Sequence, residues 1–180
     1  LGSENITKDL LRKAASASKI LVISSAERSL GKGDSSTSVI YVKDLYGPRM
    51  NFSKAGLSTI LAQSIAGGAA RVPESGSFYP TYIPDAGREI VRMLLSFSPP
   101  SGEVALLGEE VSSTQLAEIL GSVGVRVALA GEKKEESIPQ VRVQRTKTQF
   151  RQGLKETFEW GRSHGVSVAK QNKERPPKNT

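Results

Sequence analysis

The sequence predicts an α/β fold built on a parallel sheet. Three observations support this prediction. Short apolar runs are typical of strands buried on both faces, the amphipathic stretches between them have helical spacing, and glycine or proline marks most of the joins. The first example is an amphipathic stretch over 6–17 that leads into the apolar run KILVISS at 19–25. A helix followed directly by a buried strand is half of a strand–helix–strand unit, the repeating element of parallel sheets.

The first third of the chain contains this helix and two predicted strands. Asn5 or Thr7 can cap the helix, and Leu10, Leu11 and Ala14 recur on one of its faces. In chain order we then expect a strand over 19–25, a Gly/Ser-rich loop over 29–38, a second strand over 38–45 and a turn at Tyr46-Gly47-Pro48-Arg49.

The middle third is predicted to contain two helices joined by short extended pieces. The first helix covers 51–67 and ends at Gly67 and Gly68. A short strand follows at Arg71 and Val72, and a brief extended piece covers 81–83. The second helix runs to about residue 97, with Asp85 as its N-cap. Its inward face is expected to carry Ile90, Val91, Leu94 and Leu95.

The last third repeats the alternation of strands and helices. We expect a strand over 103–107, a helix over 114–123, a strand over 125–129, a charged loop over 131–137, a short edge strand at Val141 and Val143, and a final helix over 148–162. The final helix should bury Phe150, Leu154 and Phe158.

Length and composition restrict the class of protein. A chain of 180 residues allows one domain, or one domain and a small lobe, with a real hydrophobic core. Cysteine is absent, which excludes disulfides and thiolate metal sites. No apolar run reaches the roughly 18 residues of a membrane span, and no signal peptide is visible. We therefore expect an intracellular protein, in the cytoplasm or an organellar matrix.

The chain is basic, with a formal net charge of +7. Such a balance favours contact with phosphates, nucleic acid or an acidic partner. Much of the excess lies in the last third, at Arg142, Arg145, Lys147 and Arg151 and in the segment 167–180. We expect that segment to be a solvated, disordered basic tail.

No motif for a dinucleotide or a metal is present. A dinucleotide site needs Gly-x-Gly-x-x-Gly between a strand and a helix, and the sequence has no such run. Gly31 and Gly33 lie in a predicted loop, so we interpret them as turn glycines. His164 is the only histidine and has no evident partner, so neither a histidine metal site nor a catalytic triad is predicted.

Two groups of polar residues remain as candidates, each with a structural alternative. Ser24 and Ser25 end a buried strand, where α/β folds place functional groups, but serines there also bond the local backbone. Tyr79 and Tyr82 lie beside Phe78 in a stretch bounded by prolines. They are expected to pack in the core or in a lid, or alternatively to stack on a base.

Six short segments, taken in order, resemble the later part of a known family. They are the helix at 5–15, the strand 20–25 ending in Ser24-Ser25, the turn Tyr46-Gly47-Pro48-Arg49, Tyr82-Ile83-Pro84-Asp85 followed by Arg88-Glu89-Ile90-Val91, the strand 103–107 leading to Leu116-Ala117-Glu118-Ile119, and FRQGLKET at 150–157 with Trp160. This order resembles the extended short-chain dehydrogenases/reductases, the NAD-dependent epimerase/dehydratase family.

The resemblance implies a fold, a division of the chain and a set of site residues. The fold would be a truncated Rossmann-like parallel sheet with a small α/β substrate-type lobe. Residues 1–50 would be the remnant of the Rossmann-like half, and 51–166 the substrate-domain-like lobe with its closing helix. Ser24 and Ser25 would be vestigial catalytic residues, and the positions implied for substrate binding are Asp44, Tyr46, Arg49, Arg71 and Arg88.

The departures from the family concern its working parts. The glycine fingerprint is absent, and so is the Tyr-x-x-x-Lys that family members carry on a helix between the two strands. In the family, this tyrosine is the acid/base and the lysine holds the nicotinamide ribose and lowers the tyrosine pKa. Asp44 replaces the usual asparagine, and Phe78 stands where many members have an arginine that contacts the substrate diphosphate. A phenyl ring cannot neutralise a diphosphate.

These features lead to three functional hypotheses. The first is a degenerate, non-catalytic member of the family that binds no cofactor by itself and acts as a structural or interaction subunit, with a protein partner or a second copy covering an exposed sheet edge. The second is the substrate-side part of an active NAD(P)-dependent nucleotide-sugar epimerase, dehydratase or reductase, whose missing half would supply the NAD(P) site. The third is a nucleic-acid-binding accessory protein, motivated by the basic stretch 142–151 and the tail.

Overall fold

The computed structural model describes residues 20–24, 37–52, 56–96, 102–132 and 141–164. For 20–24 and 37 the description covers the backbone. The predicted helix over 6–17, most of the loop over 29–38 and the tail over 167–180 lie outside the described residues.

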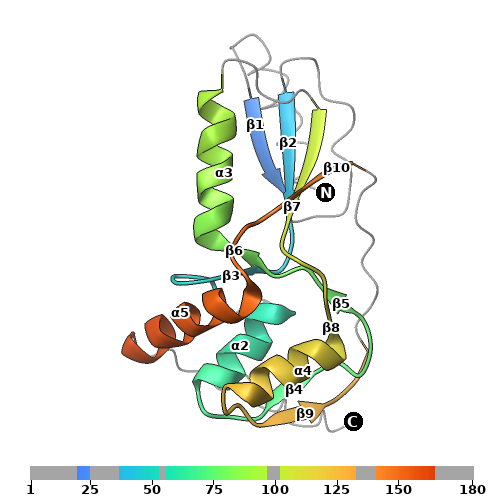
Figure 1. Cartoon of the computed structure of the whole chain (residues 1–180), viewed down its shortest axis with the longest axis vertical. Helices are drawn as coiled ribbons and strands as arrows, with labels where there is room; N and C mark the ends of the chain where they lie inside the picture. The colour runs from blue at the N-terminus through green and yellow to red at the C-terminus, as the bar shows by residue number, and fades with distance from the viewer. Residues whose placement is uncertain (1–19, 25–36, 53–55, 97–101, 133–140, 165–180) are drawn as a thin grey trace, which may run out of the picture.

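A four-stranded parallel sheet forms one end of the molecule (Figure 1). Its strands are β1 (Ile20–Ser24), β2 (Thr37–Val42), β7 (Gly102–Leu107) and β10 (Arg142–Arg145), in the spatial order β1-β2-β7-β10. Each neighbouring pair is parallel. The predicted α/β class with a parallel sheet is therefore confirmed, and the short strand expected near Val141 and Val143 belongs to this sheet.

The sheet is buried on both faces by different side chains. On one face, Ile40 and Val42 of β2 and Val104 and Leu106 of β7 pack against the helix α3 (Ile83–Leu95). On the other face, the alternate residues Val39, Tyr41, Ala105 and Leu107 form a second buried cluster. The two clusters follow from the period of two along a strand, which sends successive side chains to opposite faces.

A lobe of three helices and three small sheets lies beyond the carboxyl ends of the strands (Figure 1). Its helices are α2 (Leu57–Ile65), α4 (Ser113–Ser122) and α5 (Phe150–Ser163). Its two-stranded sheets pair β3 (Leu45–Tyr46) with β6 (Thr81–Tyr82), β4 (Ala70–Val72) with β9 (Val127–Leu129), and β5 (Ser77–Phe78) with β8 (Val111–Ser112). The lobe core includes Tyr46, Leu61, Leu116, Leu154 and Phe158.

Several predicted elements have different bounds in the structure. The strand expected over 38–45 breaks after Val42, because Asp44 adopts a positive φ of 46° and the chain turns from the sheet into the lobe. The helix expected over 51–67 begins only at Leu57. At the start of α4, Ser112 and Gln115 form a capping box, in which each side chain accepts a hydrogen bond from the backbone amide of the other residue. The helix therefore begins at Ser113, directly after this cap.

The prediction for α3 was wrong in two respects. Asp85 is not its N-cap, because the helix begins at Ile83 and Tyr82 takes the cap position, with Pro84 in the first turn. The prediction of which face of α3 is buried was also wrong. Val91, Leu94 and Leu95 are 52%, 54% and 78% exposed. The helix rests on the sheet through the narrow stripe of Ala86 and Met93, with Ile90 half-buried beside it.

The division of the chain at residue 50 stays a prediction. The four-stranded sheet contains β1 and β2 from before that boundary and β7 and β10 from after it. The sheet and the lobe are thus interleaved in the sequence. No helix among the described residues is long and apolar enough to cross a membrane.

Candidate functional site

The candidate site is the junction where the carboxyl ends of β2, β7 and β10 meet the lobe. Ligands in open α/β sheets bind outside the carboxyl ends of the strands. Asp44 follows β2, Gly108 follows β7 and Lys147 follows β10, so these residues come to the same edge of the sheet. Ser24 ends β1 at this edge, but its side chain and Ser25 lie outside the described part of the chain.

Asp44 connects the sheet edge to the lobe. One carboxylate oxygen accepts a hydrogen bond from the Tyr79 amide at 2.8 Å, and the Asp44 carbonyl accepts one from the Thr81 amide at 3.1 Å. Thr81 is fully buried, and its hydroxyl accepts a hydrogen bond from the Gly108 amide at 3.1 Å. The carboxylate that was predicted to contact substrate is therefore occupied by a backbone amide.

Gly108 is required by the close approach of two backbone segments. A Cβ at this position would lie 1.7 Å from the carbonyl oxygen of Pro80. The guanidinium of Arg145 donates a hydrogen bond to the Gly108 carbonyl. The ends of β7 and β10 are thus fixed against the segment that precedes β6.

The Tyr79 ring lies close to two cations at this edge. Its ring centroid is 5.7 Å from the Lys43 Nζ and 5.9 Å from the Arg145 Cζ. Burial raises the pKa of the Tyr79 phenol, and the Glu110 carboxylate raises it further. Phe78 and Tyr82, its neighbours in the sequence, are 1% and 4% exposed and pack in the lobe core. Core packing, which was expected for Tyr79 and Tyr82, is therefore confirmed for Tyr82.

Tyr46 is a core residue of the lobe. Its side chain is 0% exposed and contacts Tyr82, with ring centroids 5.3 Å apart, and Phe150 at 5.1 Å. Within the described residues its hydroxyl has no hydrogen-bond partner. Burial raises the pKa of Tyr46, and the nearby Tyr82 and Asp85 add to this effect. The buried phenol therefore stays protonated.

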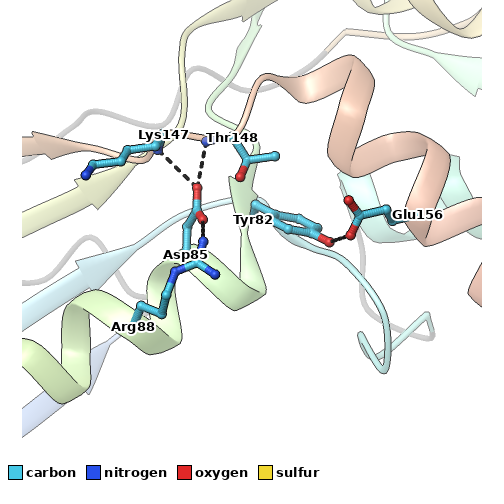
Figure 2. A network of polar contacts seen from close by, with 6 residues as sticks. All are labelled: Tyr82, Asp85, Arg88, Lys147, Thr148 and Glu156. Atoms are coloured by element: carbon cyan, nitrogen blue, oxygen red, sulfur yellow. Dashed lines mark hydrogen bonds and ion pairs between the residues drawn. The ribbon is translucent and has the colours of Figure 1, made fainter.

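Asp85 is the centre of a polar network that joins α3 to the start of α5 (Figure 2). The side chain is 4% exposed, and one oxygen accepts hydrogen bonds from the amides of Lys147 at 3.0 Å and Thr148 at 2.7 Å. The other oxygen forms an ion pair with Arg88. Burial alone would raise the pKa of Asp85, but the Thr148 and Lys147 hydrogen bonds and the Arg88 charge outweigh it and hold the pKa below its ordinary value.

A second link in Figure 2 joins the beginning of α3 to the middle of α5. The Tyr82 hydroxyl donates a hydrogen bond to the Glu156 carboxylate. Burial raises the pKa of Tyr82, and this hydrogen bond raises it further. Gly153 lets α5 come this close, since a Cβ there would lie 2.4 Å from the Tyr46 hydroxyl and 2.8 Å from the Tyr82 ring.

The three arginines predicted to bind substrate lie on separate elements. Arg49 is exposed in the turn after β3, with a φ of 66°. Arg71 is exposed on β4, which lies at the end of the lobe away from the large sheet (Figure 1). Arg88 is paired with Asp85 on α3. The three arginines therefore belong to three different elements, and Arg88 is engaged by Asp85.

A pocket of about 340 Å³ opens between the segment 109–111, α4 and the start of α5. Its lining includes three carboxylates, Glu109, Glu110 and Glu118, and one cation, Arg151. This balance of charge disfavours a diphosphate. The described residues contain no cluster of histidine, aspartate or glutamate side chains that would hold a metal ion. His164 is exposed and stacks on Trp160, with centroids 4.4 Å apart.

Sequence reasoning missed the Asp85 network as a unit. Its partners are separated from Asp85 by 62 and 63 positions, so no local signal identifies them. A signal did exist for Gly153 and Gly161, because two glycines inside an amphipathic helix usually mark a close contact. Both positions face close neighbours, Tyr46 and Ile65 respectively.

Comparison with protein-family models and with curated protein sequences gave no match. Solved structures do share the fold. The UDP-glucose 4-epimerase of Thermotoga maritima, solved with UDP-glucose, is 17% identical, with 71% of this chain and 46% of that chain covered and a TM-score of 0.54. The UDP-glucuronic acid 4-epimerase of Bacillus cereus, solved with UDP-glucuronic acid and NAD, is 14% identical at the same coverage, with a TM-score of 0.55.

A third structure is matched over more of its length. The UDP-glucose 4-epimerase of Thermus thermophilus, solved with NAD, is 14% identical, with 86% of this chain and 68% of that chain covered and a TM-score of 0.60. This chain therefore spans about half the length of the first two epimerases. At these identities the likeness shows the fold: an α/β chain that corresponds to part of a Rossmann-like epimerase structure.

Proposed function

We propose that this chain is a non-catalytic, epimerase-like protein that acts as a structural or interaction subunit. The observation that carries the proposal is the connection between β1 and β2. These strands are parallel neighbours, and residues 25–36 join them with the sequence SAERSLGKGDSS. The family that the sequence resembles places its Tyr-x-x-x-Lys in this connection. Since 25–36 contain no tyrosine, they cannot supply the acid/base pair.

The polar groups at the junction of sheet and lobe support the same proposal. Asp44, Tyr82 and Asp85 are each held by a partner within the chain. A substrate could use these groups only by displacing hydrogen bonds that connect the sheet, α3 and α5. Buried polar groups with their partners satisfied stabilise a fold, whereas groups poised for chemistry need an accessible reacting atom.

The described residues also do not fit a dinucleotide. Such a site needs a helix that begins at a glycine-rich turn directly after a strand of the parallel sheet, so that backbone amides approach the pyrophosphate. None of the four described helices begins in this way. If NAD(P) binds, parts outside the described residues must hold it.

The alternative is a substrate-side part of an active NAD(P)-dependent nucleotide-sugar epimerase, dehydratase or reductase. It is favoured by the likeness to epimerases solved with UDP-sugars and NAD, and by the coverage of less than half of their length. In that case another polypeptide segment would bring the glycine-rich loop and the catalytic tyrosine, and Ser24 or Ser25 would assist that tyrosine.

A turnover assay separates the two proposals. The purified full chain is incubated with NAD⁺ and UDP-glucose, and separately with UDP-glucuronic acid, while an active epimerase is assayed in parallel. The formation of the 4-epimer is followed by chromatography, and NAD⁺ binding by quenching of Trp160, the single tryptophan. We expect neither turnover nor saturable NAD⁺ binding. Turnover by the chain alone would overturn the proposal, and turnover that appears only with a companion carrying Tyr-x-x-x-Lys would establish the alternative.

A further inference from the structure

The pocket of about 340 Å³ lies in the lobe, between the connection 109–111, the helix α4 and the first turn of α5 (Figure 1). Its volume is at the lower end of the range for ligand pockets, so it would hold one or two side chains of a partner rather than a whole helix. Every residue that lines it belongs to the described part of the chain. Its base and rim are therefore formed by side chains of known burial and charge.

The base of the pocket is apolar and belongs to the lobe core. Val111 and Phe150 line the pocket, are only 7% and 8% exposed, and are members of the buried lobe cluster. Ile119 of α4 also lines the pocket and packs against that cluster. Because core packing holds these side chains in place, the base offers a fixed apolar surface to the methylene groups of a ligand.

The rim of the pocket carries three carboxylates and one cation. Glu109 and Glu110 directly precede β8, Glu118 lies on α4, and all three side chains are exposed. Arg151, in the first turn of α5, is the single cation of the lining and is exposed as well. Three negative charges and one positive charge leave the rim at −2, in a chain whose formal net charge is +7.

The rim charges are available to a ligand. Among the described residues, none of the four rim side chains takes part in an ion pair, and the pairs of Arg88 and Arg92 lie within α3. Glu110 accepts a hydrogen bond from the Tyr79 hydroxyl. Glu109 and Glu118 are therefore the carboxylates best able to receive a cation, and they lie on two different walls.

An apolar base with an acidic rim favours an arginine side chain. Its methylene groups can lie along the base, and its planar guanidinium presents five donors that can bond carboxylates on two walls at once. A phosphate or an acidic segment would instead meet three carboxylates. A bare metal ion is also disfavoured, because the described residues contain no group of carboxylates placed to hold one.

The arginine could belong to a partner or to the basic segment 167–180 of this chain. That segment contains one arginine, Arg175, and Glu174 directly precedes it. A carboxylate beside the guanidinium would face the acidic rim and oppose docking. The last described residue, His164, also lies at the opposite end of α5 from the pocket, about 20 Å away along a helix of 14 residues. An arginine without an acidic neighbour, supplied by a partner, meets the charge pattern better.

We propose that this pocket docks an arginine-bearing segment of a partner protein. The inference gives the proposed interaction role a surface, and rests on that role only for its biological context. The guanidinium would contact Glu109 and Glu118, and its methylene groups would contact Val111 and Phe150. Arg151 would repel a second cation and so limit the pocket to one arginine. Arginine is among the residues that most often dominate binding energy at protein interfaces.

The test uses the full chain and three short peptides that are blocked at both ends. The first carries one arginine between apolar residues, the second has citrulline in its place, and the third has lysine. Citrulline keeps the length and shape of the arginine side chain but carries no charge. Binding is followed by two-dimensional methyl NMR, which detects weak complexes and locates the contact. NAD and nucleotide sugars are absent, so a failure here is distinguishable from the result of the turnover assay.

We expect the arginine peptide to shift the methyl signals of Val111 and Ile119. The Kd should be at least about fivefold higher for the citrulline peptide and about threefold higher for the lysine peptide. Glu118→Gln should raise the Kd of the arginine peptide about three- to fivefold. Glu159→Gln is the matched control, because it removes an exposed carboxylate of α5 that does not line the pocket, and it should leave the Kd unchanged. Arg151→Gln should lower the Kd about twofold or more, because it removes the cation of the rim.

The inference is wrong if the arginine and citrulline peptides bind alike, if neither binds, or if Glu118→Gln behaves like Glu159→Gln. Tighter peptide binding by an Arg175→Gln variant would mean that the chain's own segment occupies the pocket, and would overturn the assignment to a partner. Equally tight binding of a single blocked arginine would overturn it as well, in favour of a small organic cation. The melting temperature of Glu118→Gln should match wild type, because the side chain is exposed, so a loss of binding cannot be attributed to unfolding.

Discussion

The Asp85 carboxylate should be one of the largest single polar contributions to the stability of this fold. It accepts hydrogen bonds from two amides at 3.0 and 2.7 Å and is 4% exposed. A hydrogen bond to a charged group contributes about 1.5–3 kcal/mol. Because the Lys147 and Thr148 amides are only partly buried and can bond water instead, we expect Asp85→Ala to lower the free energy of unfolding by about 3 kcal/mol. For a chain of this size, that is a fall in melting temperature of about 6–12 °C.

The matched control is Arg88→Ala, which removes the ion pair but leaves both amide hydrogen bonds. The Arg88 side chain is 71% exposed, so this pair should contribute only about 0–1 kcal/mol. Both variants can be followed by urea unfolding, with Trp160 on α5 as the fluorescent probe and circular dichroism as the second probe. An Asp85→Ala change below about 0.5 kcal/mol, or an Arg88→Ala change of equal size, would refute this account of the network.

The same carboxylate gives a dependence on pH with a defined sign. The pKa of Asp85 is lower in the folded chain than its ordinary value of 3.8. Its contribution is therefore fully present above the unfolded pKa and is lost as the pH falls through the folded pKa. In wild type the free energy of unfolding should decline below about pH 4, and Asp85→Asn should show a smaller decline over that range. Parallel pH profiles would contradict the assignment.

Three further predictions follow from the lobe and the charge of the chain. Tyr46→Phe removes a buried hydroxyl that lacks a partner within the described residues, so it should stabilise the fold by up to about 1 kcal/mol in urea unfolding. Tyr82→Phe loses the hydrogen bond to Glu156 and should destabilise the fold by about 1 kcal/mol. The opposite order of stabilities would contradict the hydrogen-bond assignment. Gly153→Ala places a methyl group 2.4 Å from the Tyr46 hydroxyl and should lower the free energy of unfolding by about 2–3 kcal/mol. Gly121→Ala on α4, where a Cβ meets no atom within 4 Å, should raise the free energy of unfolding by about 0.5–1 kcal/mol, and thermal melts of both variants test these opposite effects. If the basic excess serves nucleic acid, the affinity for a duplex should fall steeply between 50 and 200 mM salt, by about a hundredfold or more, and a flat salt profile or no binding in an electrophoretic shift assay would exclude that role.

The sequence alone determined the fold class and most of the elements. Short continuous apolar runs specified strands such as β2 and β7, and helical spacing specified α4. These signals are local, because the period of the apolar residues reports which side of an element is buried. The order of the segments 46–49, 82–85 and 150–157 also indicated the epimerase-like fold that the solved structures share.

Only the tertiary structure decided what the polar residues do. Asp85 looked like a helix cap, yet its carboxylate reaches amides that lie 62 and 63 positions later. Tyr46 looked like part of a substrate-binding turn, yet two aromatic rings and α5 enclose it. Val91, Leu94 and Leu95 looked like core because they are apolar, yet α3 meets the sheet on a different face. Hydrophobic pattern fixes how each element is built, but the partner of each side chain depends on contacts between segments far apart in the sequence, which no local pattern contains.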